Sequence, residues 1–165
     1  MMIRRFFRHL FTTRAATRRA FPDASLDAIE SGIAEGEKTH RAEIRVIIET
    51  AISIEAVLSR MTPRERALEL FGRYGIWDTE ENCGILIYIN LADRQVEIVA
   101  DRGISTKINP DEWNHICKIM TAGFSQGRFH ESTLEALSAL NQLLAQQVPS
   151  TGPHENQLPD HPIRL

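Results

Sequence analysis

The sequence predicts an α/β domain in which helices cover both faces of a small mixed β-sheet. Three apolar runs have the length of strands, and segments of helical period lie before the first, between the first two, and after the third. Because a helix separates the first two runs, we expect them to be parallel with a right-handed connection. The third run follows after a short turn, so it should be antiparallel to the second.

The three strand predictions depend on residue type. Residues 43–49 (EIRVIIE) are rich in β-branched side chains. Residues 84–90 (GILIYIN) are almost continuously apolar, which is typical of a central strand buried on both faces. Residues 96–100 (VEIVA) follow a turn at 91–94 and complete a hairpin. The predicted order of elements is therefore α-β-α-β-β-α-α.

The helices are predicted from capping residues and apolar spacing. A first core helix is expected near 25–39. The second begins at Thr62, where TPRE supplies an N-cap, a proline for the first helical position and a glutamate that closes a capping box. Asn109 starts a third helix in the same way, and Ser132 starts a fourth.

Length and composition suit one domain, with 165 residues of which 42% are hydrophobic. Residues 1–21 hold six arginines and no acid, so the remaining 144 residues carry 13 basic and 22 acidic side chains. This acidic body argues against a nucleic-acid partner, because phosphate binding needs clustered Lys and Arg. Cys83 and Cys117 stand in apolar segments, which suits a reducing compartment, and no apolar run reaches the length of a membrane-spanning helix. We therefore expect a cytoplasmic protein.

The two ends of the chain are expected to differ from the domain at 22–148. Residues 1–21 form a basic amphipathic segment and linker, in which the apolar side chains of residues 1–11 fall at helical spacing between arginines. Such a helix can lie peripherally on an anionic membrane or dock on a protein partner, or it can simply pack on its own domain. Residues 149–165 contain four of the seven prolines and are predicted to be disordered.

The predicted strand directions gather polar loops at one edge of the sheet, where the first two strands begin and the third ends. Oxygen-rich loops of this kind can hold Ca²⁺ or another divalent cation, and the sequence indicates no organic cofactor. The alternative is a solvated acidic rim whose carboxylates pair with arginines. The candidate ligands are Asp78, Glu81, Asn82 and Asp101, with Glu43 and Arg102 as further candidate site residues.

The segment 77–104 (WDTEENCGILIYINLADRQVEIVADRGI) resembles the TPM domain family. The matching features are an acidic or amide pair before a glycine and an apolar run, an Asp-Arg turn, and a strand that ends in a glycine loop. The similarity extends over about 23–147. It implies a Rossmann-like α/β/α sandwich, a Ca²⁺ or other divalent-cation site in the acidic loops, and a weak phosphatase activity in some members. Relatives often have aspartates where Glu81 and Asn82 stand, which lowers the charge expected at such a site.

Two functions follow from these observations. The first is an accessory or binding module that acts through a protein partner or a membrane surface, with or without a bound cation. The second is a metal-assisted acid phosphatase, in which Glu81, Asn82 and Asp101 hold the ion and Arg102 stabilises developing charge. The sequence carries no motif for a covalent phosphate intermediate, so enzymatic activity is left open.

Overall fold

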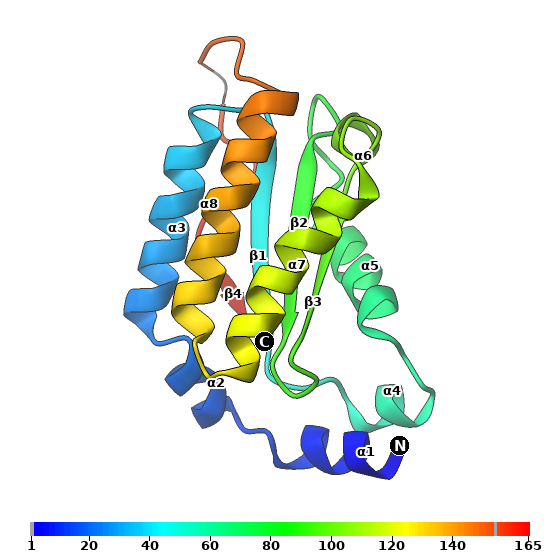
Figure 1. The fold of residues 1–165 in the computed structure, drawn as a ribbon. Helices are drawn as coiled ribbons and strands as arrows, with labels where there is room; N and C mark the ends of the chain where they lie inside the picture. Colours follow the sequence, from blue (N-terminus) through cyan, green and yellow to red (C-terminus); the bar gives the residue numbers. More distant parts are fainter. Residues whose placement is uncertain (1, 154) are drawn as a thin grey trace.

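The computed structural model describes residues 2–153 and 155–165. They fold into an open four-stranded sheet with helices packed around it (Figure 1). The strand order is β3-β2-β1-β4. β1 (Glu43–Glu49) pairs parallel with β2 (Gly84–Asn90), and β2 pairs antiparallel with β3 (Gln95–Ala100). These directions confirm the mixed α/β sheet that the apolar runs predict.

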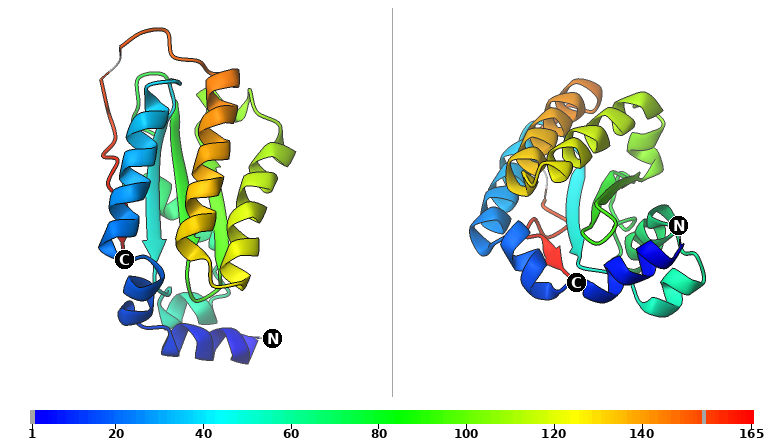
Figure 2. Two further views of the ribbon diagram at one scale, coloured as in Figure 1. Left: turned by 60° about the vertical axis from the view of Figure 1, so that its left-hand side comes forward. Right: turned by 60° about the horizontal axis from the view of Figure 1, so that its bottom comes forward.

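Helices cover both faces of the sheet (Figure 2). α3 (Asp23–Glu37), α7 (Pro110–Ser125) and α8 (Phe129–Gln147) pack on one face over a core that contains Ile44 and Ile48 of β1 and the isoleucines of β2. α5 (Pro63–Arg73) covers the other face. Alternate residues of the central strands supply both cores, which is why their sequences are apolar throughout.

Local sequence signals fix the ends of several helices. The capping box predicted before α5 is present, with the Thr62 and Glu65 side chains each accepting the other's backbone N–H. Asn109 caps α7, and Asp101 caps the short α6 (Arg102–Ser105). α8 begins three residues before the predicted start at Ser132, since Ser132 bonds back to the Arg128 carbonyl inside the helix.

The N-terminal helices lie across the end of the sheet toward which β1 and β2 run (Figure 2). They are α1 (Met2–Phe11) and α2 (Arg14–Ala20), and α4 (Ile54–Leu58) packs beside α1. Residues 12–20 were expected as a linker, but α2 forms because Thr13 caps it and Thr17 bonds to Thr50 at 2.7 Å. Within residues 2–153 and 155–165, none of the helices combines the length and apolar character needed to cross a membrane.

The C-terminal segment differs from the disorder expected for 149–165. β4 (Ile163–Arg164) adds to the free edge of β1 in parallel. Before it, the backbone N–H groups of Gln157 and Leu158 donate to Glu43 Oε2 at 3.0 and 3.1 Å, and Leu158 is buried. Hydrogen bonds to β1 thus order this segment, although its low apolar content predicted disorder.

Candidate functional site

The predicted loops do meet at the amino end of the parallel strands. The Asp101 N–H donates to the Gly84 carbonyl, and the Gly103 N–H donates to the Asn82 carbonyl, each at 2.9 Å. A Cβ at Gly103 would lie 2.3 Å from the Glu81 carbonyl oxygen, so only glycine allows this approach. The strand topology therefore places 78–82 beside 101–103, as the sequence indicated.

The candidate side chains at this acidic rim (78–82 and 101–103) have protein partners or point to solvent. Glu81 forms an ion pair with Arg41, and Asp101 accepts the Arg102 N–H at 2.7 Å. Glu43 is fully buried and holds the C-terminal segment, whereas Asp78 and Arg102 are exposed. Within the described residues, Asp78, Glu81 and Asp101 do not bring one ligand atom each to within 4.8 Å of one another.

A cavity of about 210 Å³ lies beside the rim, and only some of the predicted site residues line it. Of the predicted site residues, only Glu43 and Glu81 line it. The other residues that line it are Arg41, Glu80, Cys83, Thr151, Gly152, Pro153 and Gln157. The cation site stays a prediction, and it would need Asp78 and Asp101 to move toward Glu81.

Sequence reasoning missed Glu37, which lies near the same end of the sheet. Its Oε1 accepts the Ile44 N–H at 2.8 Å, and only 6% of the residue is exposed. Burial raises the pKa of this carboxyl to about 8. No motif marks Glu37, because its burial follows from the packing of α3 against β1.

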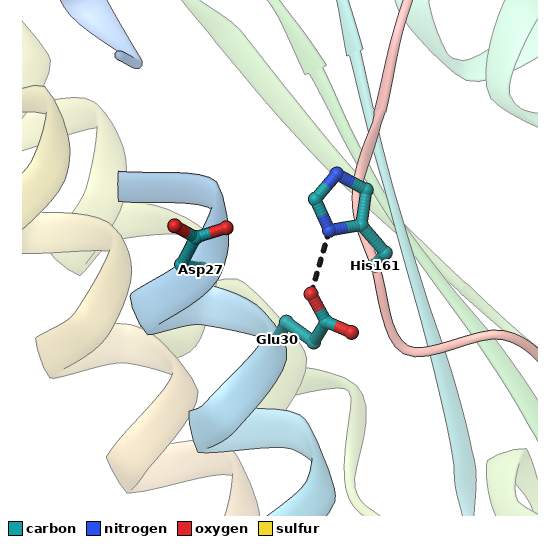
Figure 3. A group of neighbouring side chains, drawn as sticks. All are labelled: Asp27, Glu30 and His161. Atoms are coloured by element: carbon teal, nitrogen blue, oxygen red, sulfur yellow. Dashed lines mark hydrogen bonds and ion pairs between the residues drawn. The ribbon is translucent and has the colours of Figure 1, made fainter. Parts of the chain in front are cut away.

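A histidine and two carboxylates meet on the surface of α3 (Figure 3). Asp27 and Glu30 lie one helical turn apart, and His161 Nδ1 of the C-terminal segment lies 2.6 Å from Glu30 Oε2. Their ligand atoms all fall within 4.8 Å of one another. The ion pair accounts for this arrangement, since all three side chains face solvent and exposed pairs of this kind are common.

At the carboxyl end of the strands, Asp93 anchors α1 to the domain. Arg5 Nη2 and Arg8 Nη2 each lie 2.9 Å from its carboxylate, and His9 Nε2 lies 3.1 Å away. His9 Nδ1 accepts the Ile52 N–H at 3.2 Å, which assigns the ring proton to Nε2, beside Asp93. Burial alone would raise the pKa of Asp93, but His9 and Arg5 outweigh burial and lower it to about 2.

A buried polar network holds the turn that carries this anchor. Tyr88 donates to Glu49 Oε2 at 2.6 Å, and Arg66 binds the same carboxylate. Asn90 donates to the Tyr88 hydroxyl and accepts the Asp93 N–H, both at 2.9 Å. Burial and the Glu49 charge raise the pKa of Tyr88, which therefore stays a neutral donor. Through the hydrogen bond from the Asp93 N–H to Asn90, the network fixes the position of Asp93.

The outer face of α1 is apolar and exposed. Phe7 and Phe11 stack with ring centroids 6.0 Å apart. Four side chains of α1 contribute to this face, with exposed fractions of 71%, 48%, 50% and 71%: Ile3, Phe7, Leu10 and Phe11. We refer to these four residues as the α1 ridge.

The mixed sheet and the helices on both of its faces define a Rossmann-like α/β domain. A model of the TPM domain matches residues 17–143, so the chain belongs to the TPM domain family, as the resemblance indicated. The search of curated proteins returned no match.

Two solved structures share the fold. The NMR structure of the BA42 protein from the psychrophilic bacterium Bizionia argentinensis has a TM-score of 0.75 at 24% identity, over 86% of this chain and 92% of that one. The N-terminal domain of a protein from P. gingivalis has a TM-score of 0.62 at 20% identity, over 80% and 81% of the two chains. At these identities, the likeness concerns the fold alone.

Proposed function

We propose that this TPM domain is a binding module that attaches peripherally to an anionic membrane surface through α1. The observation that carries the proposal is the α1 ridge, which exposes two phenylalanines and two aliphatic side chains on one helix. Large side chains gathered on one exposed helix face are unusual for a surface in contact with water only. They suit insertion among lipid headgroups and acyl chains.

The charges of α1 favour an anionic lipid surface over an apolar protein groove. At about 100° per residue, Arg4 and Arg8 follow the ridge on one side of the helix. Arg4 is exposed, and α2 adds the exposed Arg14 and Arg18 nearby in the chain. Each basic side chain near an anionic leaflet contributes about 1 kcal/mol of attraction.

The anchor at Asp93 supports the proposal because it holds the ridge in place before binding. His9 is buried, with its ring in contact with both Asp93 and the Ile52 backbone. This face of α1 therefore points into the domain, and the ridge on the opposite face points outward. A helix that is already formed and oriented loses less conformational entropy when it binds.

Vesicle sedimentation with the full chain tests the proposal. We expect binding to phosphatidylcholine vesicles that contain phosphatidylglycerol, weaker binding in high salt, and little binding to pure phosphatidylcholine. Partial burial of two Phe side chains is worth roughly 1.5–3 kcal/mol, so Phe7→Ser/Phe11→Ser should weaken binding at least about tenfold.

The matched control is Leu68→Ser/Trp77→Ser, which removes side chains of similar exposure, 50% and 55%, outside α1. The control should bind like the wild type. The proposal is wrong if anionic vesicles do not bind, or if the control loses as much affinity as the α1 variant. A protein partner would then be the better explanation of the ridge.

Metal-assisted hydrolysis of a phosphomonoester is the second candidate, and the contact between 78–82 and 101–103 favours it. A model phosphate ester, assayed with purified protein and divalent cations, tests it. The rate should disappear with a chelator and in Asp101→Asn. Activity that persists in this variant would come from a contaminant.

A further inference from the structure

A cavity of about 480 Å³ opens at the carboxyl end of the strands, between the N-terminal helices and the β2–β3 turn. Its apolar wall includes Leu91, Ala92 and Phe129. This volume lies within the range of small-molecule sites. Open α/β sheets usually bind their ligands outside the carboxyl ends of the strands, which is where this cavity lies.

The polar lining of the cavity is basic. Arg8 and Thr12 contribute from the end of α1 and the residue after it, Arg19 from α2, and Arg94 from the β2–β3 turn. None of the described residues that line it is acidic. The neighbouring Asp93 is already in contact with Arg5, Arg8 and His9. Neither Arg19 nor Arg94 has a side-chain hydrogen bond or ion pair in the part of the chain that the structure describes. Two guanidinium groups thus line the cavity without a counter-charge.

We propose that this cavity binds the phosphate monoester headgroup of an anionic lipid. A phosphate monoester carries a charge of about −1.5 to −2 at neutral pH, which matches two free guanidinium groups. Arginine binds phosphate oxygens through paired N–H groups, which makes it well suited to this ligand. Thr12 also lines the cavity, but its hydroxyl donates to the Arg8 carbonyl at 2.7 Å, so the arginines are the donors that remain for a phosphate.

The position of the cavity favours a lipid as the source of the phosphate. Arg8 lines the cavity and also lies beside the α1 ridge on the helix surface. A headgroup in the cavity would therefore leave its acyl chains near the ridge. This inference rests on the proposed membrane attachment and names the lipid chemistry that it selects.

The test compares two lipids in phosphatidylcholine vesicles: phosphatidic acid, which carries a phosphate monoester, and phosphatidylserine. The full chain should bind phosphatidic acid vesicles about tenfold more tightly. Arg19→Gln/Arg94→Gln should abolish this preference. The control Arg14→Gln/Arg18→Gln removes two arginines of α2 that do not line the cavity, and should weaken binding to both lipids equally while keeping the preference.

A second experiment, with a soluble phosphate monoester, tests the cavity without a membrane. sn-Glycerol 3-phosphate, titrated into the full chain, should shift the amide NMR signals of Leu91, Ala92 and Gly127 in the wild type and not in Arg19→Gln/Arg94→Gln. Equal wild-type affinity for the two lipids, or loss of the preference in the control, overturns the inference while leaving membrane attachment intact.

The absence of binding to either lipid would refute membrane attachment. It would also refute the inference that the phosphate in the cavity belongs to a lipid. Shifts with glycerophosphate would then assign the cavity to a soluble phosphomonoester. If those shifts are also absent, the cavity does not bind phosphate.

Discussion

The two ends of the β-sheet carry opposite charge and treat that charge differently. At the amino end, Glu81 pairs with Arg41 and Asp101 caps α6, while buried Glu43 holds the C-terminal segment. At the carboxyl end, Asp93 meets two arginines and a histidine, and Glu49 pairs with Arg66, whereas the side chains of Arg19 and Arg94 have no partner among the residues that the structure describes. The acidic end uses Glu43, Glu81 and Asp101 to hold the fold, whereas the basic end presents Arg19 and Arg94 to a cavity beside the α1 ridge.

This difference argues against choosing a site by counting carboxylates. Acidic loops are frequent at the ends of strands, and the fold uses such side chains as caps and as acceptors for backbone N–H groups. Charges without partners, beside a cavity and an exposed apolar helix, are the rarer combination. The comparison can be tested by neutralising one group at each end.

The largest change in the free energy of unfolding is expected at the amino end, from Glu37→Gln. The folded chain holds a proton on Glu37 up to about pH 8, whereas the unfolded chain releases it near the ordinary glutamate pKa of 4.5. This contribution to stability is therefore complete below about pH 4.5 and is lost as the pH rises toward 8, with an upper value of roughly 5 kcal/mol. Glutamine stays neutral, so the variant should lose less stability between these pH values.

Urea unfolding at several pH values between 4.5 and 8 measures this effect. The control is Glu35→Gln, on the same helix but with 73% of its side chain exposed, which should follow the wild type. Parallel profiles for the wild type and Glu37→Gln would mean that Glu37 is charged in the folded chain.

A smaller effect is expected at the carboxyl end, from Asp93→Asn. The pKa of Asp93 falls from 3.8 to about 2 on folding, so its contribution is present above about pH 4 and is lost as the pH falls through 2. This shift corresponds to about 2 kcal/mol. The substitution should release α1, because Arg5, Arg8 and His9 lose their shared acceptor.

Hydrogen exchange locates the loss. The amides of α1 should exchange faster in Asp93→Asn, while those of the central strands keep their relative protection. Arg94→Gln, at the adjacent residue, should leave α1 protected. Uniform loss of protection over the whole domain would show that α1 is part of the cooperative core instead of a docked segment.

The sequence predicts the parts of the fold that depend on local signals. The run at 84–90 and the capping box at Thr62 identified their strand and helix without tertiary information. The resemblance at 77–104 likewise identified the family. The placement of 78–82 beside 101–103 followed from strand direction alone.

The features that the sequence did not predict depend on contacts between distant residues. β4 forms because β1 offers a free edge at Ile47 and Ile48, which no pattern in the proline-rich segment reveals. The anchor joins His9 to Asp93, 84 positions later in the chain. The alternation of arginines with His9 in α1 was a usable signal, since a histidine on the face opposite the phenylalanines indicates a side that packs on the domain.

The smallest effect is expected from cations at the acidic rim. If Asp78, Glu81, Asn82 and Asp101 bind Ca²⁺, the ion must displace Arg41 from Glu81 and the Arg102 N–H from Asp101. We therefore expect binding only at millimolar Ca²⁺, with amide NMR shifts confined to 78–82 and 101–103. Glu81→Gln should remove these shifts.

The control for this titration is Glu131→Gln, which neutralises an exposed glutamate in the first turn of α8, outside the rim. It should leave the Ca²⁺ response unchanged. Shifts spread over all acidic surfaces, or shifts that persist in Glu81→Gln, would show non-specific screening. Since screening needs no built site, the rim would then serve only to hold the loops together, and the carboxyl end would be left as the ligand-binding end of the sheet.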